Sequence, residues 1–475
     1  MWTKGAAAPR VRLLAVLAAV SSFPSSSWAD QIPLVGQGPA PAVGAQDHSQ
    51  NYTFDPLLHL PGLSPYFDAV GFGLEHSAPL GCKVTAASYL VRHAAIYAND
   101  NDYEQFMEPF LSAWNETGKD WTGPLQVLNE WESPYTDLDN QMEQLTPAGA
   151  EDSTKVARHL LQRYPDLVPT TNKVYSDGKA RTRDTAKAFI KAFPQKVELK
   201  KIHKQGEEHA VIPHKSCDAF TKAAGDKEQQ IFMHQYTRGI IARLQPHAPF
   251  SLKPNQIVGL QQLCGYESAI TGRVSKLCDI FTPMDWLAYE YLWDLKYYYM
   301  VGPGNPLSTY LGFPWLNVTA ELFSQLHNVD DDAASSKSKA DESQRFFVSF
   351  THREVPPFLA TALGLFNSSS GVDEAMPLDR INFPRSWKMA ELIPFLGHIG
   401  IEKMSCGPDS GAMGGSEFIR VLANSAPRPI PQCQSGPGAS CELFEFQKFA
   451  LEGLKKYGAF DKVCENGKDE KDKRQ

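Results

Sequence analysis

Several common signatures are missing from this sequence. Its eight cysteines form no Cys-x-x-Cys pair, so a zinc site and a resident metal are not expected. Neither Gly-x-Ser-x-Gly nor His-Glu-x-x-His occurs, which leaves a serine hydrolase or a zinc hydrolase without support. No apolar run approaches about 18 residues, and no internal repeat is found. A membrane-spanning protein and a repeat protein are therefore both disfavoured.

Positively charged residues are also fewer than negatively charged ones. The chain has 46 Lys and Arg against 54 Asp and Glu, a formal net charge of -8. An acidic surface of this kind argues against nucleic acid or an anionic membrane as the partner. An anionic substrate would need a local positive pocket to hold it against that field.

The first 29 residues have the pattern of a secretory signal peptide. Lys4, Arg10 and Arg12 precede a short apolar run at residues 13–20, and Ala29 offers a cleavage site before Asp30. We therefore predict a secreted, extracellular protein. An even number of cysteines fits disulfide formation in that compartment, with Cys264/Cys278 and Cys433/Cys441 able to close local loops. Four sequons are candidate glycosylation sites: Asn51, Asn115, Asn317 and Asn367.

The order of strand and helix patterns indicates an α/β protein with a helical insertion. Residues 30–81 are rich in Pro, Gly and Ser and are predicted to form an extended arm. Residues 82–199 and 301–475 form the α/β domain, with strands at 84–91, 171–175, 345–350, 388–396, 399–405 and 418–422. Its helices are expected at 103–117, from 147, at 186–193, at 358–366 and at 443–457, and residues 200–300 form the insertion, with helices at 231–244, 255–268 and 283–300.

The strand at 84–91 ends directly in Arg92-His93. In α/β folds ligands bind beyond the carboxyl ends of the strands. A guanidinium binds oxyanions with two bonds, and an imidazole can attack phosphorus. The dipeptide Arg158-His159, by contrast, is typical of an exposed helix surface.

Two later segments repeat this arrangement. The strand at 171–175 runs into the basic stretch 179–185, where a cation such as Arg181 opposes the helix dipole unless it meets an anion. The strand at 345–350 leads into His352, Arg353 and Glu354 and then a helix. Taken as structural features, Glu354 would favour a helix start and His352 would be a hydrogen-bonded imidazole.

These three segments, in this order, resemble the histidine acid phosphatases, in particular their fungal phytase-like branch. The stretch from Leu145 to Gly149 is similar to the family's Leu-Thr-x-x-Gly helix start, and residues 386–422 are similar to its late antiparallel hairpin. The resemblance implies a mixed central sheet flanked by helices. It also implies four disulfides: Cys82–Cys406, Cys217–Cys464, Cys264–Cys278 and Cys433–Cys441.

Carried over by this resemblance, His93 is the nucleophile that forms a phosphohistidine. Arg92, Arg181 and His352 hold the phosphoryl oxygens, and Glu354 protonates the leaving alcohol. The sequence departs from the family pattern where Arg-His-Gly-x-Arg-x-Pro is expected, because Ile96 stands in place of the second arginine. Arg353 or Arg183 could supply the missing charge.

The expected function is a secreted phosphoric monoester hydrolase with an acidic optimum and no cofactor. His93 must be unprotonated while Glu354 holds a proton, which places both in the mildly acidic range, between reference pKa values of about 4.3 and 6.5. The partner would be a small phosphomonoester, and phytate is suggested by the resemblance alone. The alternative is a secreted phosphate-binding protein of the same fold that has lost turnover through Ile96.

Overall fold

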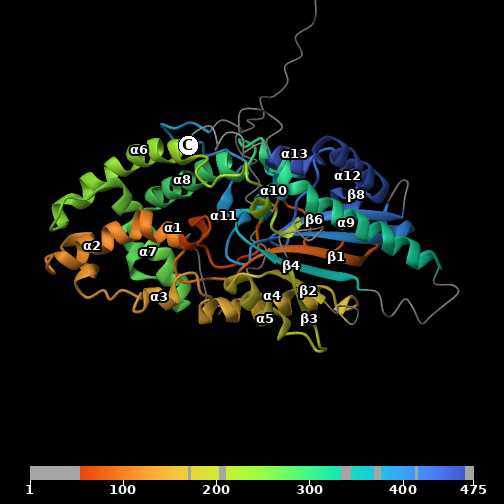
Figure 1. Cartoon of the computed structure of the whole chain (residues 1–475), viewed down its shortest axis with the longest axis horizontal. Coiled ribbons are helices and arrows are strands. Elements are labelled where there is room, and N and C mark those ends of the chain that lie inside the picture. Colours follow the sequence, from red (N-terminus) through yellow and green to blue (C-terminus); the bar gives the residue numbers. More distant parts are fainter. Residues whose placement is uncertain are drawn as a thin grey trace, which may run out of the picture. The chain divides into compact units, whose positions relative to one another are not determined.

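A mixed sheet forms the centre of the fold. The structure, a computed structural model, describes residues 54–168, 173–202, 210–332, 344–367, 376–411 and 416–465, which fall within a single unit of the chain (Figure 1). The strands are β1 (Cys82–Arg92), β2 (Lys173–Asp177), β3 (Glu198–Ile202), β4 (Phe346–Thr351), β5 (His398–Cys406), β6 (Glu417–Ala423), β7 (Ala426–Pro427) and β8 (Cys441–Glu442). Their order is β3-β2-β4-β1-β5-β6-β7, with β8 paired to β6.

The sheet changes direction at β1. The strands β3, β2, β4 and β1 run parallel, whereas β5 and β6 pair antiparallel on the other side of β1. The β5–β6 pair is the late antiparallel hairpin that the sequence predicts. Since β1 and β4 are adjacent and parallel, with Arg92 opposite Thr351, the segments that follow both strands leave the sheet at the same edge.

Side chains of β1 alternate between two apolar layers. Ala87, Tyr89 and Val91 pack with α4 (Pro147–Arg163) and α5 (Ala180–Ile190) on one face. Ala86 and Leu90 belong to the core on the other face, which also contains residues of α9 (Leu307–Asp332), α10 (Val355–Ala362) and α12 (Leu443–Tyr457). Figure 1 shows these two helical layers on either side of the sheet. A strand buried on both faces explains the apolar run that the sequence shows here.

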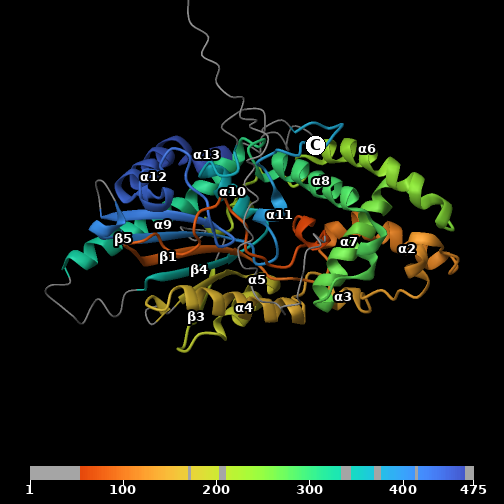
Figure 2. The ribbon, with the colours of Figure 1, turned by 180° about the vertical axis from the view of Figure 1, so that it is seen from behind.

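The remaining long helices gather at one end of the sheet (Figure 2). They are α6 (Asp226–Leu244), α7 (Pro254–Thr271) and α8 (Pro283–Val301), joined by α2 (Glu108–Glu116). The three predicted helices of the insertion are thus present. Their buried residues share one continuous core with α9 and α10, so the domain boundaries proposed from the sequence stay a prediction.

Short elements complete the chain. They are α1 (Asp100–Asp102), a π-helix (Tyr103–Met107), α3 (Leu138–Gln141), α11 (Met389–Leu392), α13 (Phe460–Glu465) and the 3₁₀ turns Pro56–His59, Gly123–Asn129, Pro213–Ser216, Gln245–His247, Lys276–Ile280, Pro408–Ser410 and Pro437–Ala439.

Several predicted elements differ from the structure in type or in bounds, among them α10, which begins at Val355 and not at 358, and α6, which begins at Asp226 and not at 231. The strand expected at 388–396 is wrong, because this stretch contains the short helix α11 and Pro394, which cannot donate to a ladder. The helix expected at 186–193 begins earlier, at Ala180, so Arg181 lies inside its first turn. The sequence also misses β3, α9 and α13.

The four disulfides join the cysteines in the pairs that the resemblance implies. None of the helices in the described part of the chain combines the length and apolar character needed to cross a bilayer. Among the sequons, Asn115 and Asn367 are exposed and Asn317 is partly buried. Asn51, the signal peptide at 1–29 and the arm as far as residue 53 lie outside the described residues, so glycosylation and export stay predictions.

Candidate active site

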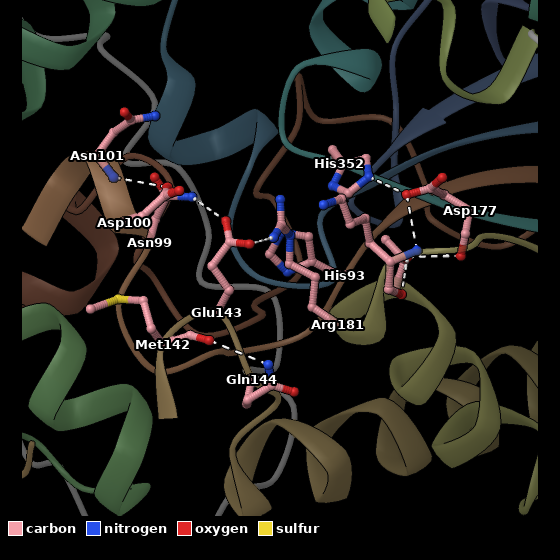
Figure 3. A network of polar contacts seen from close by, with 12 residues as sticks. His93, Asn99, Asp100, Asn101, Met142, Glu143, Gln144, Asp177, Arg181 and His352 are labelled. Carbon is pink, nitrogen blue, oxygen red and sulfur yellow. Dashed lines mark hydrogen bonds and ion pairs between the residues drawn. The ribbon is translucent and has the colours of Figure 1, made fainter. Parts of the chain in front are cut away.

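Three strand ends bring the predicted residues together. Arg92 of β1 lies opposite Thr351 of β4, and Ser176 of β2 lies opposite Phe350 on the other side of β4. The residues that come next along these three strands therefore meet at one edge of the sheet. They are His93, Asp177 and His352. The rings of His93 and His352 are 6.0 Å apart between centroids, and Arg181 lies beside His93 in Figure 3.

The imidazole of His93 is held in one tautomer. Its Nδ1 lies 2.9 Å from the carbonyl oxygen of Ala94, which can only accept, so Nδ1 carries the proton. Nε2 then keeps its lone pair. Burial, followed by the charges of Arg92 and Arg181, holds the pKa of His93 well below its ordinary value. The site thus favours the neutral imidazole of His93, which is the form a nucleophile requires.

Arg181 is positioned by the contact between α5 and the loop after β1. The Thr185 hydroxyl accepts from the main-chain N–H of Ala94 at 3.0 Å and donates to the Arg181 carbonyl at 2.6 Å. The guanidinium pairs through one terminal nitrogen with Glu143 at 2.6 Å. Its Nε is buried and has no hydrogen-bond partner.

Arg92 is almost fully buried, and its terminal nitrogens are already engaged. They donate to the carbonyls of Ile393 at 2.6 Å and Gly62 at 2.8 Å, and the guanidinium lies over the Phe395 ring at 4.5 Å. Burial lowers the pKa of Arg92 to about 10. The two terminal nitrogens that were expected to bind phosphate thus donate to main-chain carbonyls instead. Only the Nε atom remains buried and unpartnered.

His352 completes the set and shows a partner that the sequence did not single out. Its Nε2 lies 2.6 Å from Asp177, whereas its Nδ1 is buried without a partner. Burial lowers the pKa of His352, although the bond to Asp177 acts in the opposite direction. Burial would raise the pKa of Asp177, but its bonds to His352 and Lys215 outweigh burial and hold that pKa well below its usual range.

Two further site residues come from a 3₁₀ turn, Pro213–Ser216, that the sequence assigned to the insertion. The Lys215 ammonium lies 2.7 Å from Asp177 and 2.7 Å from Nε2 of His352. The His214 ring is 6.1 Å from the His352 ring, and its Nδ1 is buried without a partner. Burial lowers the pKa of His214 to about 3. A His-Lys pair two residues before a disulfide cysteine is the signal that could have drawn attention to this turn.

Glu354 lies at the start of α10 and is buried. Burial would raise its pKa, but the charge of Lys222, 3.3 Å away, together with Arg353 and the nearby histidines, holds the pKa well below the ordinary value. In the empty site these cations oppose the protonated form that the sequence analysis expects for Glu354 in the mildly acidic range. Sequence spacing could not show the cations that surround this carboxyl.

The structure also locates the candidates for the missing positive charge. Ile96 is buried in the apolar core, and its main chain pairs with Leu145. Arg183 is exposed and bound to Asp184 at 3.1 Å, which disfavours it as the compensating charge. Arg353 is bound to Asp102 by contacts of 2.9 and 3.3 Å.

A cavity of about 410 Å³ lies beside this cluster, and Glu354 and Arg353 form part of its wall. Its charged lining consists of Asp102, Glu104, Asp226, Glu354, Lys222, Lys296 and Arg353. Each cation has a carboxylate partner: Arg353 pairs with Asp102, Lys222 with Glu354, and Lys296 with Asp226. The cavity is therefore nearly balanced in charge, and Trp293 and Tyr297 of α8 supply aromatic wall.

Chemically, the cluster offers one lone pair and several unused donors. Buried donors without partners are rare in folded proteins, and each calls for an explanation such as a ligand. Arg92 Nε and Arg181 Nε are such donors, and both side chains lie within electrostatic reach of His93. This arrangement fits an oxyanion next to a nucleophilic nitrogen.

Comparisons with known proteins find acid phosphatases and phytases. A phytase of Candida albicans is 25% identical over 432 residues, which cover 87% of each chain. An acid phosphatase of Komagataella pastoris is 27% identical over 430 residues, 86% of each chain. The crystal structure of the phytase from D. castellii has the same fold, with a TM-score of 0.74 at 22% identity over 86% of this chain and 88% of that chain.

The sequence pattern of the Histidine phosphatase superfamily (branch 2) matches residues 83–424. The matched stretch contains the three strand ends, both histidines of the cluster, Arg181 and Glu354. It takes in well over half of the chain, and the chain therefore belongs to the histidine phosphatase superfamily, branch 2.

Proposed function

We propose that the chain is a secreted acid phosphatase that hydrolyses small phosphomonoesters through a phosphohistidine on His93. The observation that carries this proposal is the pair of buried, unpartnered donors on Arg92 and Arg181 beside an imidazole with a free lone pair. The family membership and the relatives named acid phosphatase and phytase support the same reaction class. Four disulfides support an oxidising, exported destination.

The reaction divides into two displacements. Nε2 of His93 attacks phosphorus, a P–N bond forms, and the bond from phosphorus to the leaving oxygen breaks. Water then attacks phosphorus, the P–N bond breaks, and inorganic phosphate leaves. The guanidinium N–H groups of Arg92 and Arg181 stabilise charge on the phosphoryl oxygens in both steps.

The proton for the leaving oxygen has to come from a group other than a preprotonated Glu354. A phosphomonoester has a second pKa near 6, so in mild acid it arrives as a monoanion that carries one proton. The negative charge of the bound phosphoryl group also raises the proton affinity of the nearby Glu354 carboxylate. We infer that Glu354 relays this proton to the alcohol and later takes one from the attacking water.

The charge balance of the cavity supports a substrate with one phosphate and an uncharged alcohol. A polyphosphorylated ring such as phytate would place several further anions against a wall that has no net positive charge. Trp293 and Tyr297 offer surfaces on which an apolar or sugar-like group can pack. Phytate remains the substrate suggested by resemblance, and the two substrates can be compared directly.

The test is a His93→Ala variant of the secreted, full-length protein. Inorganic phosphate release is measured with p-nitrophenyl phosphate and with phytate from about pH 4 to about pH 7. The wild type should release phosphate, faster from the monoester, and the variant should lose at least about 10³-fold in kcat. His159→Ala, the exposed histidine of the other Arg-His dipeptide, is the matched control and should be unaffected.

Two outcomes would contradict the proposal. Equal rates for wild type and His93→Ala would exclude His93 as the nucleophile. Binding of inorganic phosphate or vanadate without turnover of any ester would favour the alternative, a phosphate-binding member of the fold that no longer catalyses.

A further inference from the structure

The donors around His93 leave part of a bound phosphoryl group without a positive partner. Both terminal nitrogens of Arg92 donate to main-chain carbonyls, and Arg181 is bound to the carboxylate of Glu143. A phosphoryl group with one or two negative charges would also lie close to Asp177, which the bonds from His352 and Lys215 keep ionised. The site therefore needs a cation on the Asp177 side.

Lys215 occupies that position in an unusual contact. Its ammonium lies 2.7 Å from Nε2 of His352, and the same Nε2 lies 2.6 Å from Asp177. Nε2 can donate to Asp177 or accept from Lys215, but not both. With Asp177 ionised, Nε2 donates to it, and an N–H of Lys215 is left facing another donor. An oxygen acceptor entering here would resolve the conflict.

The turn that carries Lys215 is firmly docked on the site. The Thr351 hydroxyl, at the end of β4, donates to the Val211 carbonyl at 2.5 Å, and Cys217 is joined to Cys464. The Lys215 main-chain N–H donates to the Ile212 carbonyl at 3.0 Å. The Lys215 side chain is 20% exposed, so its ammonium is reachable from solvent while its main chain is fixed.

We propose that Lys215 binds the phosphoryl group directly, with its ammonium donating to a phosphoryl oxygen beside His352 and Asp177 holding it in place. This inference rests on the proposed phosphatase function. It assigns to Lys215 the charge that Ile96 does not provide. Lys215 has two effects here: it forms a charge-assisted bond to the anion, and it neutralises Asp177, which would otherwise repel the anion.

The first test compares Lys215→Met with Lys215→Arg in the full-length protein. The readouts are the inhibition constant of inorganic phosphate and the separate kcat and KM values for p-nitrophenyl phosphate. Loss of one charge-assisted bond should weaken phosphate inhibition about 10- to 100-fold in Lys215→Met, whereas Lys215→Arg should stay within a few-fold of wild type. Lys187→Met, an exposed lysine on α5, is the matched control.

A second pair of variants separates direct binding from a role through Asp177. In an Asp177→Asn background, Lys215→Met should still weaken phosphate inhibition by about tenfold if the ammonium touches phosphate. If Lys215→Met has no further effect in that background, Lys215 acts only as the counterion of Asp177 and the inference fails.

The native protein gives a test that does not depend on the variants folding. Saturating inorganic phosphate should slow reductive methylation of Lys215 severalfold, read by peptide mass spectrometry, while Lys187 reacts at an unchanged rate. Equal methylation of Lys215 with and without phosphate, in a protein that phosphate demonstrably inhibits, would overturn the inference. A wild type that hydrolyses no ester would instead overturn the proposed function.

Discussion

At the scale of single residues, the unpartnered nitrogens around His93 carry an energetic consequence. A buried donor without an acceptor costs roughly 1–3 kcal/mol of stability, and Arg92 and Arg181 each present one. The empty site is therefore less stable than the same site with an acceptor for each of these donors. An oxyanion that accepts from these donors recovers the cost, which is how a preorganised site favours charge on the phosphoryl oxygens.

Replacing Ile96 by arginine would not restore a phosphate-binding charge in this protein. Ile96 is 2% exposed and packs in the apolar core, so an arginine there would be buried without a partner, which costs several kcal/mol. We expect Ile96→Arg to lower the urea midpoint strongly, or to prevent folding, without raising kcat/KM.

The control for this substitution is Ile96→Val, which should cost about 0.5–1.5 kcal/mol and keep the activity. A folded Ile96→Arg protein with an unchanged midpoint and faster turnover would show that the position 96 side chain can reach the phosphate after all. That result would also weaken the case for Lys215.

At the scale of elements, the first turn of α4 supports the loop that carries His93. Thr146 caps the helix, accepting from the Gly149 N–H at 2.9 Å and donating to the Ala95 carbonyl at 3.2 Å. A Cβ on Gly149 would lie 2.4 Å from that carbonyl oxygen and 2.8 Å from the Ala95 nitrogen. The glycine of the Leu-Thr-x-x-Gly stretch is therefore required by a close backbone approach, not by a special backbone angle.

Gly149→Ala should push the segment after His93 away from α4. We expect a loss of about 1–3 kcal/mol in the free energy of unfolding, as for overpacking, together with a lower kcat, because the His93 carbonyl and imidazole move with that segment. Urea unfolding and steady-state kinetics measure the two effects.

Gly239→Ala in α6 is the matched control, since a Cβ there meets nothing within 4 Å. It should leave kcat unchanged and stabilise the protein by up to about 1 kcal/mol. Equal behaviour of the two variants would mean that the α4 contact does not position the loop.

Elements with an apolar pattern were predictable and those without one were not. Strand β1 and helices α6, α7, α8 and α12 are rich in apolar residues, and the sequence predicted each of them. Strand β3 is an edge strand with exposed charges, and α9 contains Pro314, so neither shows its usual signal. The start of α5 was placed too late because basic residues in a first turn oppose the helix dipole.

The same distinction applies to the site. His93, Arg181 and His352 follow strands, and the parallel order of those strands is enough to bring them together. Glu143, His214 and Lys215 lie at loop or turn positions whose place depends on tertiary contacts such as the Cys217–Cys464 disulfide. Local sequence patterns do not encode those contacts.

At the scale of the whole molecule, buried histidines tie folding to pH. Burial lowers the pKa values of His93, His214, His352 and His398, the last to about 4. In the unfolded chain each imidazole takes up a proton near pH 6.5, whereas in the folded protein each stays neutral until the pH is lower. The unfolded state therefore binds more protons between these values, and stability falls as the pH drops below about 6.5.

Asp294 affects the pH dependence of stability in the opposite direction. Burial raises its pKa to about 7, so its contribution to stability is present in acid and is lost as the pH rises towards 7. One carboxyl of this kind offsets only part of the histidine effect. Asp177 and Glu354 have lowered pKa values, so their contributions to stability are also lost in acid. We expect a lower urea midpoint at about pH 4.5 than at about pH 7.

The contribution of His398 to this pH dependence of stability can be measured separately. Its imidazole stacks on Tyr66 and lies outside the catalytic cluster, and the difference between pKa values of about 6.5 and about 4 corresponds to roughly 3 kcal/mol. His398→Phe keeps the ring contact and cannot take up a proton. Whatever its absolute stability, the variant should lose about 2 kcal/mol less than wild type between about pH 7 and about pH 4.5, while His234→Ala, an exposed histidine of α6, should follow the wild type. An identical pH dependence in all three proteins would mean that His398 takes up its proton in the folded state as readily as in the unfolded chain.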